Sequence, residues 1–339
     1  MFKRRLALFI AILCQVWLLS AQAITMGTPL ATVRLVKVDV VTEQEFRAEI
    51  AKREQLENRS YSQADKQTVL NAMIDNLLFL QMCERDGIRV TDAEIEQKIT
   101  EVRSASPSPQ QFEATLASQG VTLADLRTLY RRQLLLQRWI TRTHAAEVAA
   151  LPPVNAQDIL SAYELRRAQL IRPDTVQIAF VFYEFTQHTE EERRAGAELM
   201  RNLAERLGTG SDSFDSLRLR ASQGGYQANP TPLYVARSEQ YLQALGQRFF
   251  DVVFSMQNNA VSAPFETDRG WWLVRRVDFY PQKQLELSDP LNLGQPGTVQ
   301  DALAMQIAQQ RQNTFLTRIL GELSAQLRTQ AEIRIVGRM

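Results

Sequence analysis

The chain has 339 residues, of which 45% are hydrophobic and 23% charged, and its formal net charge is +1. At about 100–200 residues per domain, this length predicts roughly two domains. The composition is that of an ordinary globular protein and excludes a disordered chain, a collagen-like chain and a disulfide scaffold. Because 39 basic residues are balanced by 38 acidic ones, no basic field favours phosphate contacts, and nucleic acid is not an expected partner.

The first 23 residues have the three parts of a secretory signal peptide. Residues 3–5 are basic, residues 6–19 are apolar apart from one glutamine, and residues 21–23 fit the small-x-small cleavage rule. We therefore expect cleavage after Ala23 and a periplasmic location. An uncleaved membrane anchor is the alternative, but the apolar run is shorter than the ~20 residues that span a bilayer.

Cleavage would take the formal net charge from +1 to −2 and leave Cys83 as the one cysteine. A single cysteine forms no intramolecular disulfide, and the apolar sequence around Cys83 predicts a buried structural thiol. With two histidines and one cysteine, a zinc site is not expected. The sequence also has no P-loop and no dinucleotide-binding glycine motif, so we expect no cofactor and no metal.

Residues 24–172 are predicted to be mostly helical after one strand. Apolar and polar residues alternate over 32–40, which is typical of a strand. A threonine followed three residues later by an acid, the pattern of a capping box, recurs at Thr42, Thr91 and Thr122. Together with apolar residues at helical spacing, these signals predict helices that begin near residues 43, 63, 92, 109 and 123.

Residues 173–283 change to an α+β pattern. A β-rich run at 175–185 and a hairpin pattern over 261–267 and 271–280 predict strands. Between them, helices are expected over residues 188–207, 214–221 and 241–254. This order of elements predicts a compact α+β domain.

Residues 284–339 are predicted to form a linker, one long helix from Thr298 to about Thr329, and a strand at 332–336. At 1.5 Å per residue the helix is about 48 Å long, so it must pack against elements distant in sequence. A lone strand cannot satisfy its backbone groups, and 32–40 is the one unpaired strand candidate. We therefore expect the C-terminus to return to the N-terminus, with residues 173–283 as an insert.

Several short stretches follow the pattern of a known family. In the helical part they are residues 73–78 and 87–95, and in the α+β part residues 249–254, 261–267 and 270–274. Together they resemble the SurA/PrsA class of exported chaperones that carry a parvulin-type prolyl isomerase domain. The resemblance implies an α+β multidomain fold, in which a mostly helical SurA-N-like domain, completed by the C-terminal helix and strand, carries an inserted parvulin-like domain.

The resemblance also implies a substrate pocket in the parvulin-like domain. Parvulins use two inward-facing histidines, one on the first strand and one on the last, and Phe180 and Trp272 hold those positions here. No catalytic residue is therefore assigned. The pocket residues that the resemblance implies are Phe180, Phe182, Tyr234, Leu245, Phe249, Phe254, Thr267 and Trp272.

The function that the resemblance implies is that of a periplasmic chaperone for unfolded exported polypeptides, with outer-membrane proteins as expected clients. Prolyl isomerisation breaks no bond, but a catalyst needs an apolar slot and polar groups that favour the twisted amide. Without the histidines we expect the module to bind peptides with lost or weakened catalysis. One alternative is an active isomerase; another is a docking surface in an envelope complex. The polar residues that an active isomerase would have to use are Tyr226, Gln227, Asn229, Tyr234 and Thr267.

Overall fold

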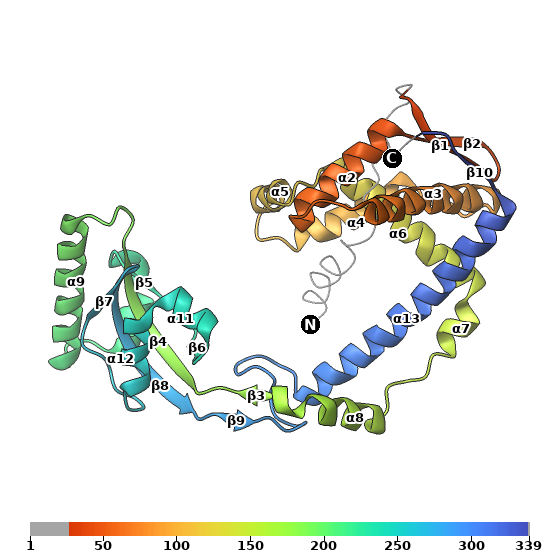
Figure 1. Cartoon of the computed structure of the whole chain (residues 1–339). Helices are drawn as coiled ribbons and strands as arrows, with labels where there is room; N and C mark the ends of the chain where they lie inside the picture. Colours follow the sequence, from red (N-terminus) through yellow and green to blue (C-terminus); the bar gives the residue numbers. More distant parts are fainter. Residues whose placement is uncertain (1–26, 338–339) are drawn as a thin grey trace. The chain divides into compact units, whose positions relative to one another are not determined.

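The computed structural model describes residues 27–337, so the predicted signal peptide lies outside the described residues. The chain divides into two compact units, Met1–Pro152 with Arg311–Met339 (unit 1) and Pro153–Gln310 (unit 2). The mostly helical architecture with small sheets confirms the predicted α+β multidomain fold class (Figure 1). Among the helices of residues 27–337, none is both long and apolar enough to cross a membrane.

Unit 1 joins a small sheet to a set of helices. Its N-terminal elements are β1 (Pro29–Arg34), β2 (Val38–Thr42), α2 (Glu43–Glu57), α3 (Gln63–Arg85), α4 (Asp92–Ser104), α5 (Pro109–Ser118), α6 (Leu123–Thr143) and α7 (Ala145–Ala149). The end of the chain adds the second part of α13 (Val299–Gln330) and β10 (Glu332–Ile335).

The helix starts predicted from the capping pattern are confirmed. Thr42, Thr91 and Thr122 each accept a hydrogen bond from the third helical backbone N–H, and the acid at that position accepts one from the cap. Such a box satisfies two backbone donors that a helix end leaves unpaired. Gly87 and Gly120 have φ values of +67° and +63°, in the left-handed region that glycine tolerates at helix ends.

The C-terminus returns to the N-terminus, as the sequence predicts. The three-stranded sheet has the order β10-β1-β2, and β1 pairs antiparallel with both neighbours. Ala31 lies opposite Ile335 and Val33 opposite Ile333. The blue C-terminal strand therefore lies beside the red N-terminal hairpin in Figure 1.

The prediction of one strand over residues 32–40 is wrong, because the segment is a hairpin. Strand β1 ends at Arg34, and residues 35–37 turn the chain into β2. The Gln81 side chain on α3 holds this turn: its Oε1 accepts hydrogen bonds from the backbone N–H groups of Leu35, Val36 and Lys37 at 2.8, 2.8 and 3.3 Å. A turn that depends on a distant side chain leaves no signal in the local alternation.

One apolar core holds unit 1 together. It joins the sheet to α2, α3 and α6 and includes Phe315, Ile319, Leu323 and Leu327 of α13. Cys83 lies in this core and is buried, as predicted, and burial raises the pKa of its thiol to about 12. A smaller apolar cluster joins α4, α5 and α6.

Unit 2 contains the predicted insert. Its helices are α8 (Ala156–Arg166), α9 (Glu190–Gly208), α10 (Phe214–Leu219), α11 (Glu239–Leu245), α12 (Gln247–Ser255) and the first part of α13, with short 3-10 turns at Arg167–Gln169 and Ala221–Gln223. Its strands are β3 (Ile171–Arg172), β4 (Thr175–Glu184), β5 (Gln227–Ala228), β6 (Leu233–Ala236), β7 (Phe265–Thr267), β8 (Gly270–Tyr280) and β9 (Lys283–Gln284).

A five-stranded sheet around β4 and β8 forms the centre of unit 2. Its order is β5-β4-β8-β7, with β6 also pairing with β4, and β3 and β9 form a separate two-stranded sheet. Apolar residues of α9 and α10 cover one face of the five-stranded sheet, and those of α11 and α12 cover the other. Gly196 of α9 lies so near the sheet that a Cβ atom would meet Tyr183 and Trp271 at under 3 Å.

Two expectations for unit 2 need correction. The single helix predicted over residues 241–254 is two helices, because Gly246 has a φ of +84° and ends α11 before α12 begins. Strands β5 and β6 lie between residues 221 and 241, a segment for which the sequence predicted neither a helix nor a strand. Both strands are short, and they form because β4 offers a free edge to pair with.

Replacing Gln81 with leucine is expected to destabilise unit 1. The change removes the side-chain acceptor of three backbone N–H groups in a partly exposed turn, at a cost of about 1–3 kcal/mol. Chemical denaturation of the Gln81→Leu variant would measure the loss. Gln137→Leu, an exposed position on α6, is the matched control and is expected to change stability little. Equal stability losses in the two variants would contradict the role assigned to Gln81.

Candidate functional site

The pairing of β4 with β8 places three of the predicted pocket residues, Phe180, Phe182 and Trp272, on one face of the sheet. Phe182 lies opposite Trp272 and Phe180 lies opposite Val274. Side chains two residues apart on a strand point to the same face, so Phe180 and Phe182 both lie beside Trp272. Helix α12 covers this face, and its Phe249 side chain packs against the same residues.

These aromatic side chains form one packed group around Trp272, which we call the aromatic cluster (Phe180, Phe182, Phe249, Phe265 and Trp272). The Trp272 ring stacks on Phe182 at 4.0 Å between centroids, and it meets Phe180 and Phe249 edge to face at 5.2 and 5.0 Å. Trp272 and Phe182 are each 4% exposed and Phe249 is fully buried. These rings therefore pack against one another at positions where the family resemblance implies a substrate slot.

Thr267 is tied to the aromatic cluster through the indole of Trp272. The Trp272 Nε1–H donates a hydrogen bond to Thr267 Oγ1 at 2.9 Å. The same hydroxyl oxygen accepts from the Arg269 backbone N–H at 3.3 Å and donates to the Gly270 carbonyl at 3.3 Å. The Thr267 hydroxyl thus forms hydrogen bonds with the buried Trp272 indole and with the backbone of the turn at residues 269–270.

The remaining predicted pocket residues divide into two groups. Leu245 and Phe254 are half-buried and pack against the edge of the aromatic cluster. Tyr234 lies on the opposite face of the sheet, since its neighbour Val235 is the residue of β6 that packs with the cluster. Its hydroxyl accepts a hydrogen bond from Gln177 Nε2 at 3.1 Å. The structure does not bring Tyr234 to the other pocket residues.

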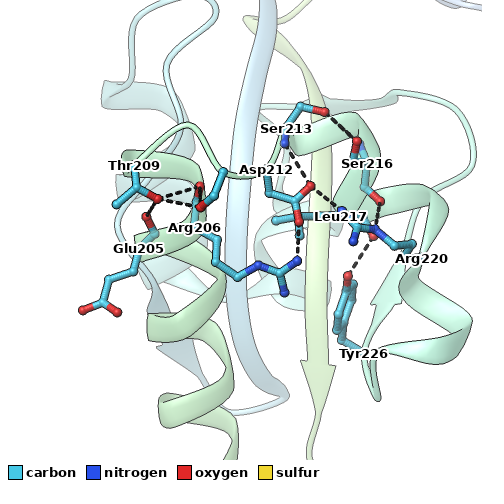
Figure 2. A network of polar contacts seen from close by, with 10 residues as sticks. Glu205, Arg206, Thr209, Asp212, Ser213, Ser216, Leu217, Arg220 and Tyr226 are labelled. Carbon is cyan, nitrogen blue, oxygen red and sulfur yellow. Dashed lines mark hydrogen bonds and ion pairs between the residues drawn. The ribbon is translucent and has the colours of Figure 1, made fainter.

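Two residues that an active isomerase would need are bonded elsewhere. The Tyr226 hydroxyl is buried under α10 and donates to the Leu217 carbonyl at 2.8 Å (Figure 2). Gln227 Nε2 donates to Glu184 Oε2 at 2.7 Å on the exposed side of β5. Neither side chain belongs to the aromatic cluster.

Asn229 has a structural role that the sequence did not reveal. Its Oδ1 accepts from the Phe180 backbone N–H at 2.7 Å, and its Nδ2 donates to the Ile178 carbonyl at 3.1 Å. The amide side chain thereby takes the place of a strand partner for β4, between the segments that pair with β5 and β6. Asn229 fixes the backbone of Phe180 rather than facing a substrate.

A buried carboxylate organises the face of the sheet opposite to the aromatic cluster. Asp212 is 2% exposed at its side chain and lies between Arg206 of α9 and Arg220 after α10, each of which donates to one of its oxygens (Figure 2). Two guanidinium partners offset the cost of burying the charge. This clamp joins α9 to α10 and was missed, because no local pattern shows which acids are buried.

Two hollows lie at the surface on either side of the α11–α12 junction. One of about 540 Å³ is lined by Leu245, Thr267 and a charged rim that includes Arg193 and Glu266. The other, of about 720 Å³, is lined by Leu242, Phe250 and Phe254 among others. Within residues 27–337, no group of three or more histidine, cysteine, aspartate or glutamate side chains is arranged to hold a metal ion.

Comparisons with known proteins agree with this architecture. The family model described as the SurA-like N-terminal domain matches residues 4–140, and that of the PPIC-type PPIase domain matches residues 180–278. The two matches define a class of proteins in which a helical domain is joined to a parvulin-type domain. Over these residues the chain is similar to SurA-like proteins with one parvulin-type domain.

Individual relatives are similar over part of their length. Chaperone SurA of Pseudomonas fluorescens is 37% identical over 108 residues, which are 31% of this chain and 24% of that protein. Chaperone SurA of Legionella pneumophila is 23% identical over 287 residues, covering 82% of this chain and 63% of the relative. A solved structure from Campylobacter jejuni, reported among SurA-like chaperones, has 13% identity and a TM-score of 0.36, covering 92% of this chain and all of the other.

Replacing Trp272 with alanine is expected to destabilise the central sheet of unit 2. The change removes the ring on which three aromatic side chains pack and leaves a cavity, at a cost of about 3–5 kcal/mol. The loss in free energy of unfolding would be measured by chemical denaturation, and native-state hydrogen exchange would locate it in strands β4 and β8. Leu219→Ala, at a position that is 86% exposed, is the control and is expected to cost little. Unchanged hydrogen-exchange rates in β8 of the Trp272→Ala variant would show that the cluster does not stabilise the sheet.

Proposed function

We propose that this protein is a periplasmic chaperone that binds unfolded exported polypeptides, outer-membrane proteins among them. Its parvulin-type domain would then bind peptides without catalysing prolyl isomerisation. The observation that carries the second part is the packing of Phe180 on Trp272, at the two positions where the family resemblance places histidines.

The chemistry of isomerisation supports the loss of catalysis. A catalyst must stabilise the twisted amide more than the planar one, which requires polar groups aimed at the substrate. Here the two strand positions carry aromatic rings, and the Thr267 hydroxyl is occupied by Trp272. The aromatic cluster leaves neither the polar groups nor the open slot that the reaction needs.

Exposed apolar groups of unit 1 support the chaperone role. Val36, Val38 and Val40, in and beside the β1–β2 hairpin, are 48%, 61% and 41% exposed. A separate hollow of unit 1, of about 210 Å³, is lined by Leu30, Phe46 and Ile50 together with charged residues. Apolar surface bordered by charges suits the binding of extended chains that still expose their own apolar side chains.

The protein is expected not to accelerate prolyl isomerisation. NMR exchange spectroscopy on a short alanyl-proline peptide, with the chain from residue 24 onward, would measure the cis–trans rate. We expect a rate within about twofold of the uncatalysed rate; uncatalysed isomerisation takes about 10–100 s at 25 °C. An active parvulin is the positive control. A large acceleration by the wild-type protein would overturn the non-catalytic part of the proposal.

The protein is expected to suppress aggregation of an unfolded outer-membrane protein. Light scattering after dilution of a urea-unfolded β-barrel protein would measure this, with an unrelated soluble protein as the negative control. Suppression is expected to weaken in a Val38→Lys/Val40→Lys variant, because charge at these positions removes apolar surface without disturbing the core. Leu165→Lys, at an exposed apolar position of α8, is the matched control. Wild-type protein that leaves scattering unchanged would refute the chaperone proposal.

A further inference from the structure

Strand β2 forms one edge of the three-stranded sheet of unit 1. The sheet order is β10-β1-β2, so β1 pairs with one side of β2, and no other strand within residues 27–337 pairs with its second side. The side chains of Val38 and Val40 on this strand are 61% and 41% exposed. An open edge that carries apolar side chains is a surface to which another strand can add.

The backbone groups of these two valines point toward the open edge. In an antiparallel sheet, the N–H and C=O groups of successive residues point alternately to opposite sides of a strand. The Glu43 N–H, directly after β2, donates to the Thr28 carbonyl at 2.9 Å, so the odd-numbered residues of β2 face β1. On the other side of β1, the Leu30 carbonyl accepts from the Val336 N–H at 2.9 Å, which agrees with this alternation. The even-numbered valines therefore direct their backbone groups to the side where a further strand can pair.

Opposite charges flank Val38 in the sequence. Lys37 precedes it and Asp39 follows it, and both side chains meet α3: Lys37 Nζ lies 2.8 Å from Glu84 Oε2, and Asp39 Oδ2 accepts from Gln81 Nε2 at 2.9 Å. When an antiparallel copy of β2 is placed with Val38 opposite Val38, Lys37 of each copy lies opposite Asp39 of the other. Cross-strand pairs of opposite charge stabilise a sheet, and like charges opposite each other destabilise it. The edge is therefore complementary to itself.

We propose that β2 is a self-association edge, at which two copies of this chain pair antiparallel about a twofold axis at Val38. The two three-stranded sheets then form one continuous six-stranded sheet. The interface is isologous, since each copy contributes the same strand. Because the edge is short and buries little area, we expect a weak dimer that dissociates on dilution. The inference does not rest on the proposed function, because the partner is the chain itself.

Sedimentation velocity of the chain from residue 24 onward, over a range of concentrations, measures the association. We expect wild-type protein to form a concentration-dependent dimer. Lys37→Asp and Asp39→Lys each place like charges opposite each other, and each is expected to weaken dimerisation by about tenfold. A 1:1 mixture of the two variants restores both opposite-charge pairs and is expected to dimerise as strongly as wild type. Lys98→Asp is the matched control, because Lys98 also lies 2.8 Å from a glutamate on the surface, and it is expected to leave dimerisation unchanged.

A disulfide test locates the contact without depending on the folding of the charge variants. In the proposed pair, Val38 lies opposite itself at a Cα separation of about 5.5 Å, which a disulfide accepts. Val38→Cys is therefore expected to form a cross-linked dimer rapidly under mild oxidation, while Cys83 stays buried. Leu165→Cys, at a position that is 86% exposed, and Ile335→Cys, on the other edge strand β10, are the controls and are expected to cross-link only by slow random collision.

Each possible result decides the inference. A monomer at every concentration, equal weakening by Lys37→Asp and Lys98→Asp, or a mixture of folded charge variants that stays monomeric would overturn it. Cross-linking at Val38 that is no faster than at the two control positions would exclude β2 as the contact. Wild-type protein that stays monomeric, but in which an unfolded client protects β2 from hydrogen exchange, would assign the edge to client strands instead of a second copy.

Discussion

The pairing of β1 with β10 is the contact on which the rest of the structure depends. It pairs Ala31 with Ile335, and all residues of unit 2 lie between these two positions in the sequence. The entropy cost of closing so long a loop grows only slowly with its length, so a large insert is tolerated. Because β10 directly follows α13, the same pairing holds Phe315, Ile319 and Leu323 in the core of unit 1.

In unit 2, one set of sheet positions serves packing where the family resemblance implies catalysis. Trp272 contacts Phe180, Phe182 and Phe249, and its indole N–H is satisfied by Thr267. The large buried area of these rings stabilises the sheet. These rings occupy the space between β4, β8 and α12.

The successes and failures of the sequence-based predictions have identifiable physical reasons. Helix starts were predicted well because a box such as Thr42 with Glu45 is made within four residues. The hairpin at residues 35–37 was missed because its turn is held by Gln81, far along the chain. Tyr234 was assigned to the pocket because the sequence does not show which side chains of β6 point to which face of the sheet. That orientation follows from the pairing of β6 with β4. The roles of the remaining pocket residues in binding stay predictions.

The sequence by itself determined where most helices begin, the two long strands of unit 2, the return of the C-terminus and the aromatic residues at the positions of the family's histidines, since each of these follows from local patterns or from residue identity. The tertiary structure decided that those aromatic rings pack on each other, that Asn229 serves as a strand partner, and that Arg237 lies over Phe254. These features join side chains from separate elements, and which of them meet depends on strand register and helix packing, which no local pattern contains.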